Sequence, residues 1–145
     1  MSKASEINYL MRTISVSGQR HFEEKTKDLN ISRSQSRTLG YIQEHPGLNQ
    51  TQLAEAFGMR PASISGSLKS LEKLKYIEKH ALKGTQDRSK KIYITEAGKQ
   101  ASNKIIDVFN DTDNQSVSGL TDEEVDQLIA LLSKSRIVSR LQKIS

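Results

Sequence analysis

Apolar residues recur every three or four positions over most of this 145-residue chain, which is the periodicity of amphipathic helices. The first such stretch covers residues 5–28, and its apolar positions are Ile7, Leu10, Met11, Ile14 and Phe22. The second begins near Ser32, which can form a capping box with Gln35, and it ends before Pro46. We therefore expect two helices in the first third of the chain.

A pair of shorter helices follows, joined by a tight turn. Asn49 and Gln52 form a second capping pattern, and Gly58 provides the positive φ needed to leave the first helix sharply. Pro61 begins the next helix at a first-turn position, where its missing N–H costs nothing. The apolar stripe of that helix consists of Ile64, Leu68 and Leu71. Two helices joined in this way predict a helix-turn-helix.

The hydrophobic period changes from helix to strand after Lys75. Residues 77–82 and 91–94 alternate in the manner of strands, and the polar residues 83–89 lie between them. This pattern predicts a β-hairpin directly after the helix-turn-helix, which is the position of a wing.

Two further helices are expected after the hairpin. Thr95 can cap the first of them, whose apolar positions are Ala101, Ile105, Val108 and Phe109. Thr121 and Glu124 form a capping box for the second, which we expect to continue to about Leu141. The fold class is therefore mostly α-helical with a small β-hairpin wing, and the length suits one domain.

Basic residues are concentrated in the predicted helix-turn-helix and hairpin. Residues 58–95 contain nine basic and three acidic side chains, whereas residues 96–132 contain two basic and eight acidic ones. A surface that binds DNA phosphates is electropositive in this way. A solvated lysine-rich face has the same composition, so charge alone leaves both interpretations open.

The second helix of the predicted helix-turn-helix has side chains suited to the major groove of DNA. An α-helix fits that groove and directs its N-terminal turn at the base edges. Small residues allow a close approach, serine hydroxyls can bond bases or phosphates, and lysine suits a phosphate. The candidates are Pro61, Ser63, Ser65 and Lys69, with Arg60 beside them. The alternative is that the small residues pack against another helix.

The predicted wing supplies a second group of candidate contacts. Arg88, near the hairpin tip, can enter the minor groove, where narrow A·T tracts concentrate negative potential. The alternative for Arg88 is a surface arginine that contacts only solvent. The candidates for phosphate contacts are Lys90 and Lys91 in the hairpin, and Gln50 and Thr51 at the start of the preceding short helix.

Taken in order, these segments resemble the MarR family of winged helix-turn-helix transcription regulators, over about residues 5–142. The resembling parts are the positioning helix with its turn, the recognition helix, and the wing with the start of the next helix: residues 48–59, residues 61–73, and residues 87–90 with Ile94, Thr95 and Gly98.

The resemblance implies how the chain is organised and what it does. It implies one domain over residues 1–145, with the DNA-binding region in 32–95 and a helical dimerisation region formed by 5–28 and 96–142. It implies a homodimer that binds double-stranded DNA sequence-specifically at an inverted-repeat operator and acts as a repressor. It also implies that a phenolic or anionic small molecule can bind between the dimerisation helices and the winged region and release the DNA.

Several residues depart from the family's usual pattern. Gln86 takes the aspartate position of the wing, because Asp87 is shifted by one residue. Gly66 stands where the recognition helix often carries an arginine, and Arg60 stands where a small polar cap is usual. Lys75 stands where a glycine commonly ends the recognition helix, and a lysine at positive φ there costs about 1 kcal/mol.

The last predicted helix has an apolar surface broader than one stripe, which favours pairing with a second copy of the chain. The alternative is that this surface packs against residues 5–28 of the same chain. Its apolar residues are Val125, Leu128, Ile129, Leu131, Leu132, Ile137, Val138 and Leu141.

No catalytic or cofactor site is expected. The chain has no cysteine, and no two of its three histidines have the short helical spacing of a metal site. His21 beside Glu23 and Glu24 is the one grouping similar to the zinc sites of some MarR relatives, and an ordinary surface histidine is the simpler interpretation. Nucleophile elbows and phosphate-cradling glycine loops are absent from the sequence, so an enzyme is not expected.

The sequence also indicates where in the cell the protein is expected, and it leaves one alternative function open. No apolar run approaches the roughly 18 residues of a membrane span, and the N-terminus lacks the apolar core of a signal peptide. We therefore expect a cytoplasmic protein without a membrane partner. The alternative function is a winged-helix protein-interaction module that binds no specific DNA and whose basic face is solvated.

Overall fold

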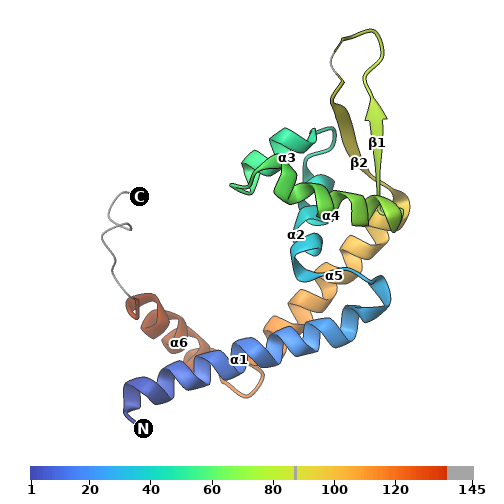
Figure 1. The fold of residues 1–145 in the computed structure, drawn as a ribbon. Helices are drawn as coiled ribbons and strands as arrows, with labels where there is room; N and C mark the ends of the chain where they lie inside the picture. The colour runs from blue at the N-terminus through green and yellow to red at the C-terminus, as the bar shows by residue number, and fades with distance from the viewer. Residues whose placement is uncertain (87, 137–145) are drawn as a thin grey trace.

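The computed structural model describes residues 1–86 and 88–136, and it has the mostly helical fold with one antiparallel hairpin that the sequence predicts (Figure 1). Asp87 and residues 137–145 lie outside the described residues. In chain order the elements are α1 (Lys3–Thr26), the 3-10 helix η1 (Lys27–Leu29), α2 (Arg33–Glu44), α3 (Gln50–Ala56), α4 (Pro61–Lys73), β1 (Ile77–Ala81), β2 (Lys90–Ile94), α5 (Glu96–Ser116) and α6 (Asp122–Lys134).

Side-chain caps determine where several of these helices begin. Reciprocal capping boxes start α2, α3 and α6, and the residue pairs that form them are Ser32 with Gln35, Asn49 with Gln52, and Thr121 with Glu124. The side chain of Thr95 caps α5 by accepting a hydrogen bond from the backbone N–H of Gly98. These four predicted starts are confirmed. The N-cap of α4, Arg60, makes no side-chain capping bond, and the helix begins on Pro61.

The buried core lies where α2, α4 and the hairpin meet the second half of α1 and the first half of α5 (Figure 1). It contains Leu39 and Ile42 of α2, the predicted stripe of α4, and Ile77 and Ile92 of the hairpin. Phe22 of α1 stacks on Phe109 of α5 with ring centroids 4.4 Å apart. This packing holds the helix-turn-helix at one end of the long helices.

The C-terminal end of α4 has the geometry that the sequence predicts for Lys75. Its φ is +65°, and the two hydrogen bonds of a Schellman motif run from the N–H of Lys75 to the carbonyl of Glu72 and from Tyr76 to Leu71. A side chain with a Cβ is strained in this left-handed conformation.

Replacing Lys75 with glycine should therefore raise the free energy of unfolding by about 1 kcal/mol, because glycine adopts positive φ without strain. Lys73→Gly is the matched control, since it makes the same chemical change inside α4 and should lower stability by about 1 kcal/mol. Urea unfolding of the two variants measures both effects. Equal destabilisation by the two changes would contradict the strain at Lys75.

The last helix is shorter than predicted. α6 ends at Lys134 instead of continuing to about Leu141, and Ser135 has an extended conformation, with φ −84° and ψ 100°. The Ser135 hydroxyl donates to the carbonyl of Leu131, which is the local bonding by which serine competes with a helix. Ile137, Val138 and Leu141 lie outside the described residues.

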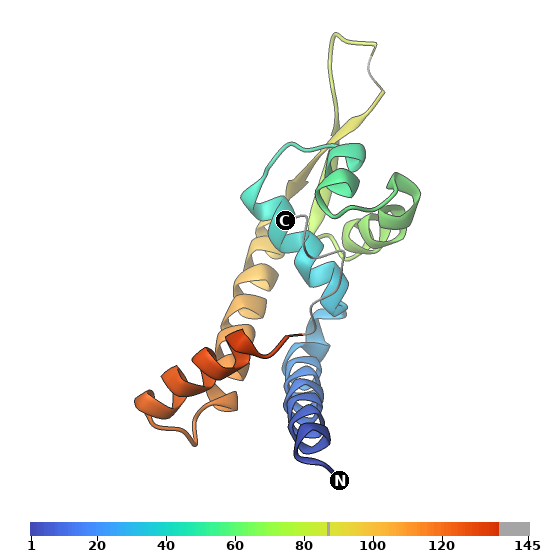
Figure 2. The same cartoon turned by 90° about the vertical axis from the view of Figure 1, so that its left-hand side faces the viewer.

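The apolar surfaces of α1 and α6 are exposed in the single chain. Ile7, Leu10 and Ile14 of α1 are 50–54% exposed, and Ile129 and Leu131 of α6 are 59% and 61% exposed. Figure 2 shows α6 separated from the first half of α1. The two surfaces therefore do not cover each other within one chain, and that alternative is wrong for the described residues. Among residues 1–86 and 88–136, no helix is long and apolar enough to span a membrane.

Candidate nucleic-acid interface

The turn between α3 and α4 fixes the angle of the predicted recognition helix. Gly58 has φ +62°, and the backbone N–H of Met59 donates to the carbonyl of Ala54, which closes α3. The Gln50 amide then donates across the turn to the carbonyl of Pro61 at 2.7 Å. Gln50 was predicted to contact phosphate, and its side chain joins the first turns of the two helices in the free protein.

The outward surface of α4 is centred on the predicted contact Lys69 and on two small residues, Ala62 and Gly66, that were not among the predicted site residues. Successive residues of a helix are turned by about 100°, and the buried stripe lies on one side of α4. Ala62, Gly66 and Lys69 lie opposite that stripe and are exposed. Ser63 is also exposed, whereas Ser65 is half-buried at the edge of this surface. Lys73, another omitted residue, continues the exposed surface toward the end of α4.

Gly66 has no intramolecular reason to be glycine. A Cβ built on it would have no atom within 4 Å, and its φ is not in the positive range. Glycine inside a helix nevertheless costs about 0.5–1 kcal/mol relative to alanine. The exposed surface of α4 is therefore recessed at Gly66, where an added Cβ would meet no other atom of the described chain, so another molecule can approach the helix backbone there.

The wing is attached to the core at its base. β1 and β2 pair antiparallel with Ile77 opposite Ile94, and Leu48 forms a bridge with Ile92. Lys91 is half-buried, and its Nζ donates to the carbonyl of Gly47 at 3.4 Å. Lys91 therefore lies near the base of the wing.

Two of the predicted wing cations are exposed. Arg88 lies in the tip, and Lys90 begins β2 opposite Ala81. Asp87, which the sequence comparison with the family's wing pattern found displaced, is outside the described residues. Of the remaining predicted contacts, Thr51, Arg60 and Pro61 are exposed at the N-terminal ends of α3 and α4. The geometry thus brings two groups of exposed cationic and small side chains, one on α4 and one on the wing, to the same end of the molecule (Figure 1).

Comparison with known proteins identifies this arrangement. A family model described as MarR family matches residues 29–85, which include α2, the helix-turn-helix and the first half of the wing. The HTH-type transcriptional regulator YybA of Bacillus subtilis (strain 168) is 32% identical over 111 residues, or 76% of this chain and 73% of YybA. The chain belongs to the MarR family. It is a transcription regulator with a DNA-binding winged helix-turn-helix.

Solved MarR-family structures have the same fold. A protein of Clostridium acetobutylicum assigned to the family superposes with a TM-score of 0.75 at 31% identity, covering 90% of this chain and 95% of that one. MepR of Staphylococcus aureus in complex with DNA superposes with a TM-score of 0.74 at 30% identity, covering 88% and 95%. MepR is a transcription regulator of the multidrug efflux pump MepA.

In this MarR-family chain, a tight backbone contact connects the winged region to α5. The N–H of Thr95 donates to the carbonyl of Tyr76 at 3.0 Å, and its hydroxyl donates to the carbonyl of Lys75 at 2.7 Å. A Cβ on Gly98 would lie 2.1 Å from the Tyr76 oxygen, so the first turn of α5 can sit here only with glycine. The end of the recognition helix is thus held directly against α5.

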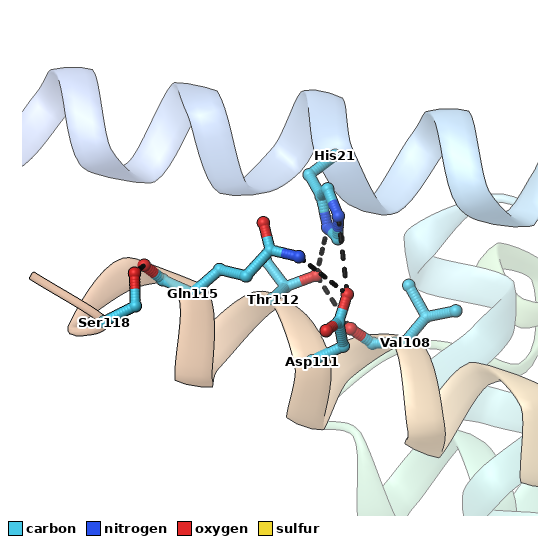
Figure 3. Close-up of polar contacts among 6 residues, drawn as sticks. All are labelled: His21, Val108, Asp111, Thr112, Gln115 and Ser118. Carbon is cyan, nitrogen blue, oxygen red and sulfur yellow. Dashed lines mark hydrogen bonds and ion pairs between the residues drawn. The ribbon is translucent and has the colours of Figure 1, made fainter.

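The His21 ring is directed at α5 in the structure. It contacts Thr112 and Asp111 of α5, instead of grouping with Glu23 and Glu24 (Figure 3). Among residues 1–86 and 88–136, no three histidine or acidic side chains are close enough together to hold a metal ion.

Proposed function

We propose that this MarR-family regulator is a repressor that binds an inverted-repeat operator as a homodimer, with α4 in the major groove. The observation that carries the proposal is the exposed surface of α4. This surface is recessed at Gly66, which has no side chain, and it carries the exposed cations Arg60, Lys69 and Lys73. A DNA-bound relative of the same fold supports double-stranded DNA as the partner.

The proposed roles follow residue chemistry and position. Ser63 and the small residues beside it approach base edges, and Ser65 has a lesser role because it is half-buried. Arg88 enters the minor groove from the wing tip. The proposed phosphate contacts are Thr51, Arg60, Lys69 and Lys90, whereas Gln50 and Lys91 contribute mainly by holding α4 and the wing.

The proposed dimer forms through the exposed apolar surfaces of α1 and α6, within the predicted dimerisation region of residues 5–28 and 96–142. The predicted DNA-binding region, residues 32–95, then lies outside the dimer contact. Two-fold symmetry would present two copies of α4 to successive major grooves, about 34 Å apart. An inverted repeat is the DNA sequence that matches this symmetry.

Sedimentation at micromolar concentration should give about twice the monomer mass, because the exposed leucines and isoleucines of α1 and α6 are then buried. Leu131→Asp should shift the protein toward monomer, since Leu131 is 61% exposed in the single chain and a buried carboxylate is costly. Ser133→Asp, on the same helix, is the control. A wild-type protein that sediments as a monomer would overturn the dimer and the inverted repeat together.

We also propose that a phenolic or anionic effector regulates binding. A cavity of about 170 Å³ lies where α1, α2 and α5 meet, between the long helices and the winged region. Phe22 and Phe109 line it, and the Arg33 guanidinium lies 5.9 Å from the centre of the Phe109 ring. An aromatic anion matches this pairing of ring surfaces with a cation.

The alternative, a protein-interaction module with a solvated basic face, differs in its response to salt. Binding of the protein to duplex DNA should weaken as salt rises, with log affinity falling by about 0.9 per phosphate contact for each unit of log salt. The three proposed cationic phosphate contacts per chain, Arg60, Lys69 and Lys90, predict a steep slope for a dimer. A flat salt dependence, or no binding at low salt, would reject the DNA-binding mode and favour the alternative.

A further inference from the structure

Gly66 forms a recess of about methyl size on the exposed surface of α4. On a helix, the neighbours of a position are the residues three and four places away in each direction. For Gly66 these are Ala62, Ser63, Lys69 and Ser70. Between them lies only the backbone of Gly66, and an added Cβ would meet no atom within 4 Å. A small group of another molecule can therefore touch the backbone of α4 at this position.

The backbone exposed in this recess has little capacity for hydrogen bonding. A helix leaves four N–H groups free at its beginning and four carbonyl groups free at its end. Gly66 lies between these two sets in α4, which runs from Pro61 to Lys73, so its N–H and carbonyl bond within the helix. A phosphate oxygen needs a donor, and the recess has none. It can therefore recognise another group by its shape and apolar character.

Thymine is the base whose edge in the major groove matches this surface. Its 5-methyl group is the apolar group that the standard base pairs present there, whereas the other base edges present hydrogen-bond donors and acceptors. The O4 acceptor of thymine lies beside the methyl group. Ser63, next to the recess, is exposed, and its hydroxyl makes no hydrogen bond within residues 1–86 and 88–136. That hydroxyl can donate to O4 while the methyl group occupies the recess.

We propose that Gly66 is a specificity-determining residue, and that its recess receives the 5-methyl group of one thymine in each half-site of the operator. Ser63 donates to the O4 atom of the same base. The inference rests on the proposed function, because it requires α4 to lie in the major groove. It goes further by naming the base, and the group on that base, that the protein recognises.

Replacing single thymines of the operator with uracil tests the inference, because uracil differs from thymine only in lacking the 5-methyl group. The operator is the sequence selected from random duplexes, and fluorescence anisotropy gives its affinity for the full chain. At least one symmetry-related pair of thymines should be sensitive. Uracil at that pair should weaken binding by about fourfold per half-site, which is the effect of burying one methyl group.

Gly66→Ala should reverse this preference, because its own methyl group fills the recess. The free protein accommodates the change. The variant should bind the thymine operator about fivefold more weakly than the wild type does. It should bind the operator with uracil at the sensitive pair more tightly than the thymine operator. Gly40→Ala makes the same change in α2, where a Cβ also meets no atom within 4 Å, and it should keep the preference for thymine.

The inference is overturned if no thymine is sensitive to uracil, or if Gly66→Ala keeps the wild-type preference at every sensitive pair. Equal weakening of Gly66→Ala on both operators also overturns it, since a sugar or a phosphate would then lie against the recess. In these cases the wild-type protein still binds its inverted repeat, so the proposed function stands. Failure to recover any operator would instead reject the proposed function and this inference together.

Discussion

Replacing Gly66 with glutamate should weaken operator binding by about a hundredfold, or about 3 kcal/mol, while the protein stays folded. Gly66 lies at the centre of the exposed surface of α4, where a carboxylate would face the acceptor-rich floor of the major groove and the phosphates beside it. The free protein accommodates the side chain, since a Cβ there meets no atom within 4 Å. Stability should even rise by up to about 1 kcal/mol.

Gly66→Gln is the matched control, because it has the same size as glutamate without the charge. It should lose much less affinity than Gly66→Glu on the operator and almost none on random duplex DNA. Fluorescence anisotropy on both duplexes, with thermal unfolding of each variant, gives the comparison. Full operator affinity in folded Gly66→Glu would exclude α4 from the groove.

Gly98→Ala should lower the free energy of unfolding by about 3 kcal/mol, the upper end of the usual cost of overpacking. The new methyl group would lie 2.1 Å from the Tyr76 oxygen and 2.7 Å from Ile94 Cγ1, and the oxygen belongs to backbone that cannot turn aside. The first turn of α5 would have to move away from Tyr76. That movement breaks the Thr95 N–H bond to Tyr76 and separates the recognition helix from α5.

Gly40→Ala makes the same change inside α2, where a Cβ has no atom within 4 Å, and it should stabilise the protein by about 0.5–1 kcal/mol. Urea unfolding at one protein concentration measures both variants, since the stability of an oligomer depends on concentration. A Gly98→Ala protein as stable as the wild type would mean that the α5 contact is less close than described.

Local chemistry explains why most element boundaries could be predicted from the sequence. The capping boxes at Ser32, Asn49 and Thr121 act over three residues, so their partners are adjacent in the sequence. The left-handed conformation of Lys75 was implied by the family resemblance, because a glycine commonly ends the recognition helix at that position. α6 was predicted too long because the hydrophobic period continues past Ser135, whereas the serine bonds its own helix end.

Only part of the candidate DNA-binding site could be predicted from the sequence. Ser65 was chosen for its hydroxyl, although its angle from the core stripe of α4 puts it at the edge of the exposed surface. That angle was available from the sequence, and it favours Ala62 and Gly66. The bonds of Gln50 and Lys91 to distant carbonyls were not available, because they depend on how α3 and the wing pack. The same holds for the meeting of His21 with Thr112, which are 91 residues apart.

Selection of bound sequences from a pool of random duplexes tests the central claim most directly, because it examines specificity, symmetry and spacing in one measurement. A homodimer that places α4 of each chain in the major groove predicts an inverted repeat whose half-site centres are about 10 base pairs apart. Recovery of sequences without dyad symmetry, or of no common sequence at all, would contradict it.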